Sequence, residues 1–122
     1  ERLLINSTTM SINDAFQIVN DLDGLFIPAH VNREAFGLIS HLGTVPPDLP
    51  VKTLEISRHI SPQKALERFP FLKNYHLIQS GDVHYIDDFL GSNQFLLDSP
   101  TLTEIKLALA GINGRLHRII PA

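Results

Sequence analysis

Short apolar runs alternate along the chain with segments in which apolar residues recur every three or four positions. The runs have the length of strands, and the run at residues 25–29 is apolar throughout, as in a strand buried on both faces of a parallel sheet. The other segments have the period of amphipathic helices. Strands are therefore predicted over residues 1–6, 25–29, 51–57, 75–79, 93–97 and 115–120, and helices over 11–22, 33–42, 61–69 and 101–110, with one or two helical turns over 85–90.

Polar residues at the ends of these segments supply helix-capping signals. Ser11 and Asp14 have the spacing of a capping box, and the same spacing recurs from Thr101. Pro62 stands at a first helical position, where its missing N–H is not needed. Gly24 is expected to end the first helix. Three apolar residues of segment 33–42 are expected to face inward, namely Phe36, Ile39 and Leu42.

The alternation of strand and helix predicts an α/β fold in which parallel strands are joined by right-handed helical crossovers. The 122 residues are enough for one domain with a buried core, residues 1–122, and too few for two. With 43% hydrophobic and 19% charged residues, the composition is that of a folded globular protein rather than a disordered one.

Charge and cysteine content narrow the classes of function. The formal net charge is −3, with acids and bases mixed along the chain, so a nucleic-acid partner is not indicated. The sequence has no cysteine, which leaves His, Asp and Glu to bind any metal ion. No apolar stretch approaches the roughly 20 residues of a membrane span, and no signal-peptide pattern opens the chain. We therefore expect a cytoplasmic protein with no membrane partner.

The most distinctive polar stretch is residues 80–84, Ser-Gly-Asp-Val-His, directly after a strand-like run. Asp82 and His84 are two residues apart, so their side chains leave an extended segment in the same direction. His30 follows the run 25–29 in the same way, and chemistry in α/β folds sits at the carboxyl ends of strands. We interpret His30, Asp82 and His84 as metal ligands. The alternatives are a histidine hydrogen-bonded at a strand end, and an Asx-turn at Asp82 beside an exposed His84.

Two histidines and one aspartate suit zinc, manganese or iron(II) rather than calcium. Such a metal lowers the pKa of a bound water and polarises a phosphoryl oxygen, which is hydrolase chemistry, and no catalytic side chain is assigned beyond that water. Arg33 and Arg58 each follow a predicted strand and would clamp a phosphate, although a solvated surface position is the favoured alternative for Arg58. Glu55 and His59 are further candidates near the ion. The remaining polar residues of interest are interpreted as structural: His41, His76, His117, Asp87 and Asp88.

Three stretches together resemble the later motifs of the PHP domain, the polymerase and histidinol phosphatase family. They are Pro-Ala-His-Val-Asn-Arg at 28–33, Leu-Glu-Ile-Ser at 54–57 and Ser-Gly-Asp-Val-His at 80–84. The resemblance covers roughly residues 18–120 and points to a subgroup found beside iron hydrogenases. Ser-Gly-Asp stands where the family has Gly-Ser-Asp, and Val31 replaces the usual proline.

The resemblance implies a distorted (β/α)7 TIM-like barrel with up to three divalent metals at the carboxyl ends of its strands. It assigns His30, Asp82 and His84 to metal, Arg33 to the substrate phosphate, and the intact protein to metal-dependent phosphoester hydrolysis of a small phosphorylated substrate. The early His-x-His motif of the family has no counterpart in these 122 residues.

We therefore expect a carboxyl-terminal portion of the domain, holding part of the metal site and weakly active or inactive alone. A partial barrel would expose strand edges that pair with the N-terminal half of the domain or with a second copy. The alternatives are a non-catalytic binding or regulatory module derived from this family, and a receiver-like doubly wound domain in which Asp82 is only a turn residue.

Overall fold

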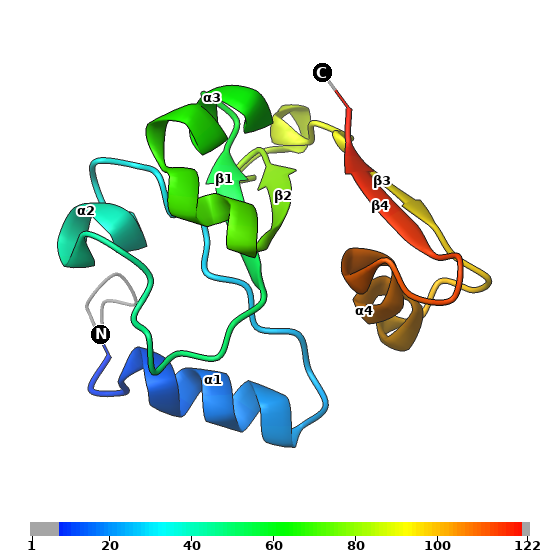
Figure 1. Ribbon diagram of the computed structural model, residues 1–122, viewed down its shortest axis with the longest axis horizontal. Coiled ribbons are helices and arrows are strands. Elements are labelled where there is room, and N and C mark those ends of the chain that lie inside the picture. Colours follow the sequence, from blue (N-terminus) through cyan, green and yellow to red (C-terminus); the bar gives the residue numbers. More distant parts are fainter. Residues whose placement is uncertain (1–7, 121–122) are drawn as a thin grey trace.

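The computed structural model describes residues 8–120, so the strand predicted at residues 1–6 lies outside the described part. Figure 1 shows a central pair of strands with helices around it and, beside β2, a second pair of strands with its own helix. The elements in order are α1 (Ile12–Asp21), α2 (Leu38–Leu42), β1 (Thr53–Ser57), α3 (Pro62–Arg68), the 3-10 helix η1 (Pro70–Asn74), β2 (His76–Ser80), the 3-10 helix η2 (Ile86–Asp88), β3 (Asn93–Leu96), α4 (Leu102–Ala110) and β4 (Leu116–Ile119).

Helix α1 begins where the capping box predicts. The Ser11 hydroxyl accepts a hydrogen bond from the Asp14 N–H at 3.1 Å, and the Asp14 carboxylate accepts one from the Ser11 N–H at 3.2 Å. The left-handed residue after the helix is Asp23, with φ 55°, and not Gly24 as expected. Gly24 is needed for another reason, because a Cβ there would lie 2.6 Å from the Val19 side chain.

Strands β1 and β2 pair in parallel, from Thr53 opposite His76 to Ser57 opposite Ser80. The chain crosses between them through α3 and η1, and Ser61 caps α3 by accepting from the Lys64 N–H at 3.3 Å. This half of the domain confirms the α/β class and the parallel pairing joined by a helical crossover.

The segment 25–29 runs beside β1 but does not form the predicted strand, and its last residue already belongs to a turn. Glu55 donates its N–H to the Pro28 carbonyl at 3.0 Å and accepts from the Val31 N–H at 2.9 Å. The pairing stops there because proline has no N–H to donate and because the Ser57 N–H goes to the side chain of Asn32 instead, at 2.8 Å.

The helix predicted over 33–42 is reduced to α2, and two of its three expected core residues are exposed. Phe36 is 82% exposed and Leu42 53% exposed, whereas Ile39 is buried. Phe36 has a left-handed φ of 63°, which ends any helix through it. Gly37 follows in close contact, since a Cβ there would lie 2.1 Å from the Arg33 carbonyl oxygen.

Strands β3 and β4 are antiparallel, with Asn93 opposite Ile119 and Leu96 opposite Leu116, so the prediction of parallel pairing is wrong for this half. Left-handed backbone at Asn113 and at the glycine after it reverses the chain after α4. Thr101 caps α4 as predicted, and the glycine after the helix takes the left-handed conformation.

The core lies under β1, where Leu54 and Ile56 are completely buried together with Leu72 from η1. The carboxyl end of β1 is therefore attached to the best-packed part of the domain. The two pairs of strands within residues 8–120 do not close a barrel, so the TIM-like barrel stays a prediction. Across these residues, none of the helices has both the length and the apolar character needed to cross a membrane.

Candidate functional site

His30 lies in the turn beside the carboxyl half of β1, in a left-handed conformation with φ 31°. Its backbone N–H donates to the Glu55 carboxylate at 3.2 Å, so Glu55 holds the turn in place. Its Nδ1 atom is buried, and no hydrogen-bond partner reaches it from the residues that the structure describes. A buried ring nitrogen without a partner costs roughly 1–3 kcal/mol, and in the tautomer with the proton on Nε2 a bound cation or proton donor would recover this cost.

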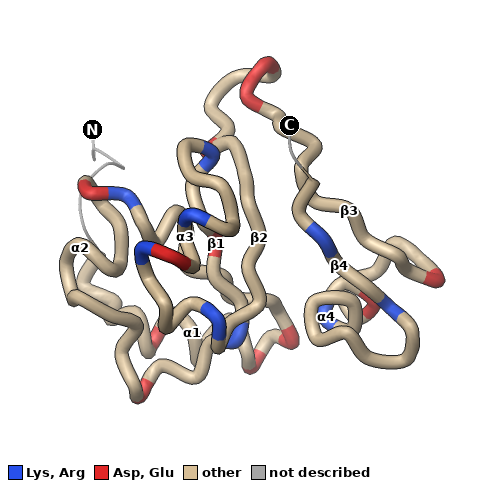
Figure 2. The backbone as a smooth tube through the Cα atoms, turned by 45° about the horizontal axis from the view of Figure 1, so that its top comes forward, with Lys and Arg blue, Asp and Glu red and all other residues tan. Residues whose placement is uncertain are grey.

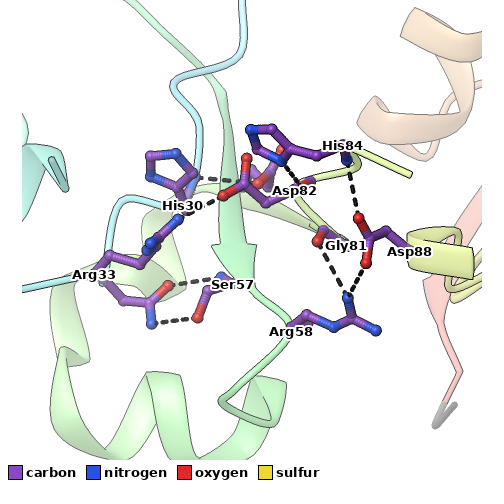
Figure 3. Close-up of polar contacts among 10 residues, drawn as sticks. His30, Arg33, Ser57, Arg58, Gly81, Asp82, His84 and Asp88 are labelled. Atoms are coloured by element: carbon purple, nitrogen blue, oxygen red, sulfur yellow. Dashed lines mark hydrogen bonds and ion pairs between the residues drawn. The ribbon is translucent and has the colours of Figure 1, made fainter. Parts of the chain in front are cut away.

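The loop after β2 brings Asp82 and His84 to the same end of the strands (Figure 3). Asp82 takes a left-handed φ of 52°, and its carbonyl oxygen lies 2.7 Å from His84 Nδ1. Because a carbonyl oxygen only accepts, His84 Nδ1 carries the proton of this contact, and in the neutral ring Nε2 keeps the lone pair. Metal-binding histidines usually orient their rings by this kind of hydrogen bond.

Arg33 joins the His30 turn to the loop after β2. Its Nη1 lies 2.5 Å from the Asp82 carboxylate, and the two side chains are 39% and 42% exposed. Asn32 fixes the same turn to the end of β1, because its amide donates to the Ser57 hydroxyl at 3.0 Å and accepts from the Ser57 N–H. The structure thus brings together three segments that lie far apart in the sequence.

Arg58 and Asp88 hold the loop from its other side. Arg58 Nη1 lies 3.4 Å from the Gly81 carbonyl and 3.5 Å from the Asp88 carboxylate. The other Asp88 oxygen accepts from the N–H groups of His84 and Tyr85, at 3.0 and 2.9 Å. These two hydrogen bonds lower the pKa of Asp88, with a smaller contribution from the charge of Arg58.

The acid dependence of this loop provides one prediction. The pKa of Asp88 is lower than 3.8 in the folded chain, so its stabilisation is complete above pH 3.8 and is lost as the pH falls through the folded pKa. In an NMR titration from about pH 6 down to about pH 2, the amide signals of His84 and Tyr85 should shift with a midpoint below 3.8. The Asp88→Asn variant should lack that transition, and a midpoint above 3.8 would contradict the contact.

Gly81 is needed because the backbone of Asp88 lies very close to it, and not because of an unusual φ. A Cβ at this position would lie 1.9 Å from the carbonyl oxygen of Asp88. Gly81→Ala is therefore expected to lower the free energy of unfolding by about 1–3 kcal/mol and to displace the amide signals of His84 and Tyr85. Gly91→Ala is the control, since its φ is 62° but nothing lies within 4 Å of its Cβ. It should leave those amide signals in place.

The three predicted metal ligands have suitable donor atoms, but their arrangement is not that of a complete metal site. Within residues 8–120, no group of three or more His, Asp or Glu side chains is placed to hold a metal ion. In the observed arrangement Asp82 pairs with Arg33. The buried Nδ1 of His30, the Nε2 of His84 and the Asp82 carboxylate remain a suitable donor set at one end of the strands. The assignment of these three residues to metal stays a prediction.

Sequence reasoning missed Asn32, Ser57 and the pairing role of Asp88. Asn32 stands two residues after His30, and Ser57 ends the run 51–57, so both positions were visible in the motifs. Their mutual hydrogen bonds depend on the fold and have no signal in the sequence alone. Arg58 is an exposed residue, in line with the solvated position that was favoured, and its guanidinium also contacts the Gly81 carbonyl and the Asp88 carboxylate. A phosphate role for Arg33 or Arg58 stays a prediction.

The fold is similar to one solved structure of known activity. The crystal structure of the lesion-specific endonuclease PfuEndoQ from Pyrococcus furiosus matches with a TM-score of 0.73 and 21% sequence identity. The match covers 86% of this chain and 28% of the endonuclease chain, so this chain spans under a third of that protein. No protein-family model matches the sequence, and no curated protein matches it. At this level of sequence identity, the structural similarity to the endonuclease is evidence for the fold alone.

Proposed function

We propose that residues 28–33 and 80–88 form part of the metal centre of a metal-dependent phosphoester hydrolase of the PHP type. One observation supports this most directly. At the same end of the strands, His30 and His84 each present a ring nitrogen that binds no described residue, and the hydrogen bond at His84 orients its ring for a ligand. The resemblance of both stretches to the metal-binding motifs of that family supports the same proposal.

Each polar group near these histidines has a role in the proposed enzyme. A divalent zinc, manganese or iron ion bound here would polarise a phosphoryl oxygen and supply a nucleophilic water. The Asp82 carboxylate would offset the charge of the ion, and Arg33, released from Asp82, would bind a phosphate oxygen. Asn32 and Glu55 position the His30 turn through the contacts described above.

The endonuclease supports the reaction class, because cleavage of a nucleic-acid strand is phosphoester chemistry. At 21% identity it supports the proposal only together with the motif resemblance. We further propose that the centre needs ligands beyond these three, from the N-terminal half of such a domain or from a second copy, and that the protein acts in the cytoplasm. These residues alone would then show weak turnover.

Zinc titration followed by NMR of the histidine rings tests the metal centre. The signals of His30 and His84 should shift together and saturate, whereas those of His41 and His76 should stay in place as internal controls. Equal shifts at all histidines, or none, would contradict the site. A receiver-like domain without metal predicts no shift.

Phosphate release from a small phosphomonoester, with zinc or manganese present, tests the hydrolase. A low rate is expected, and Asp82→Asn should abolish it. A non-catalytic module is the alternative, and it is favoured by the observation that both Arg33 and Arg58 are engaged by acids of the loop. Equal background release by the parent chain and the Asp82→Asn variant would support that module.

A further inference from the structure

A cleft of about 650 Å³ opens beside the candidate site, between the His30 turn, the end of β1 and one side of α3. Arg33 lines the cleft and pairs with Asp82, so the cleft adjoins the proposed metal ligands without including any of them. Its size falls in the range of small-molecule sites, roughly 300–1,000 Å³. Its lining is rich in hydrogen-bond donors: Arg33, Ser57, His59, Lys64 and Arg68.

The charge in this cleft is mostly positive, although the whole chain has a net charge of −3. Three of its residues are cations, and the one acid that lines it, Glu67, accepts a hydrogen bond from Gln63 at 3.0 Å. Arg68 lies 3.9 Å from Glu34, with both side chains largely exposed, which makes a weak pair. Within residues 8–120 no ion pair involves Lys64. The cleft therefore favours an anionic occupant.

One residue that lines the cleft, Ser57, is buried and has a hydroxyl proton available for a hydrogen bond. Ser57 is 6% exposed, and its hydroxyl accepts from the Asn32 amide at 3.0 Å. A serine hydroxyl also has one proton to donate, and across residues 8–120 no acceptor takes it. An oxygen of a bound anion would satisfy this donor, and Lys64 and Arg68 line the same cleft from α3.

We propose that this cleft is a second anion site, which takes a phosphate group of the substrate separate from the phosphate at the metal ligands. This inference rests on the proposed hydrolase function. Arg33 would lie between the two groups, since it pairs with Asp82 on one side and lines the cleft on the other. The substrate is then a small molecule with two phosphate groups.

The distribution of charge favours a small substrate over a nucleic-acid strand. Figure 2 shows the lysines and arginines of residues 8–120 scattered along the backbone and interspersed with acids, rather than gathered in one continuous band. A strand of nucleic acid needs such a band to bind its successive phosphates.

The test is an NMR titration of the metal-free chain with inorganic pyrophosphate at physiological salt. The amide signals of Ser57, Lys64 and Arg68 are expected to shift and saturate. The double variant Lys64→Gln with Arg68→Gln should weaken binding about tenfold or more, because both charge-assisted contacts are lost. The matched control is Lys73→Gln with Arg118→Gln, which removes the same charge from exposed positions outside the cleft and should bind like the parent.

Three results would overturn the site: equal affinity of the parent and the double variant, shifts confined to residues 82–84, or shifts scattered over the surface that do not saturate. A hexathymidine strand that binds more tightly than pyrophosphate would overturn the assignment to a small substrate. Zinc binding at His30 and His84 is measured separately. Its failure would contradict the hydrolase, while loss of pyrophosphate binding alone would contradict only this second site.

Discussion

Replacing Leu54 by alanine is expected to lower the free energy of unfolding by about 2–5 kcal/mol. Leu54 is completely buried in β1 and packs in the core cluster with Ile56 and Leu72. The truncation removes buried apolar surface and leaves a cavity that the neighbouring strands fill only in part. A domain of this size has a total stability of about 5–15 kcal/mol, so the variant should be close to unfolding. Urea denaturation, with an unchanged slope, measures the loss.

Leu22→Ala is the matched control for Leu54→Ala, because it makes the same chemical change at a side chain that is 78% exposed. It should change the free energy of unfolding by no more than about 0.5 kcal/mol. Equal losses for the two variants would contradict the arrangement of the core around β1. The site would then lose its rigid base, since the His30 turn is bonded to this strand at Glu55 and Ser57.

Local signals in the sequence predict those elements whose stability is local. Ser11 and Asp14 cap α1 with one another, and Pro62 and Thr101 stand at the starts of α3 and α4 as expected. Such signals need only residues within one helical turn, so they are visible before any tertiary contact is known. The two parallel strands were found because their apolar runs alternate with helices.

Features that depend on distant residues could not be predicted in the same way. Phe36 and Leu42 have helical spacing, yet no helix joins them. The left-handed φ of Phe36 and the close backbone contact at Gly37 prevent it. The run 25–29 has a strand-like composition, but it does not pair with β1 as a strand. Pro28 has no N–H to donate, and the Asn32 side chain accepts the Ser57 N–H that would have continued the pairing. The Asn-Gly pair at 113–114 indicates a turn in the sequence, but such a signal does not specify the antiparallel direction in which β4 pairs with β3.

The candidate site shows the same division. Its residue types were visible in two motifs, and the structure places both motifs at one end of the strands. The ion pair between Arg33 and Asp82 joins residues 49 positions apart, and that between Arg58 and Asp88 joins residues 30 apart. Periodicity and spacing do not reveal contacts between such distant residues. The ion pairs of both arginines were therefore not predicted.

Asp82→Asn is expected to lower zinc affinity about 100-fold or more, because the amide oxygen lacks the charge that a divalent ion requires. Stability without metal should change by only about 0–1 kcal/mol, since Arg33 and Asp82, 39% and 42% exposed, form a partly solvated ion pair near the surface. Isothermal titration calorimetry measures the affinity. The control is Asp87→Asn, which removes the same charge five residues further along the same loop and should bind zinc like the parent.

Zinc should also stabilise the parent against urea, and at the same concentration it should stabilise Asp82→Asn by no more than about 0.4 kcal/mol. At a free zinc concentration 100 times the dissociation constant, a ligand that binds only the folded state adds about 2.7 kcal/mol. Equal stabilisation of Asp82→Asn and the parent would place the zinc elsewhere on the chain. It would leave Asp82 with the role that the structure shows directly, that of an acid which pairs with Arg33 and holds the His30 turn to the loop after β2.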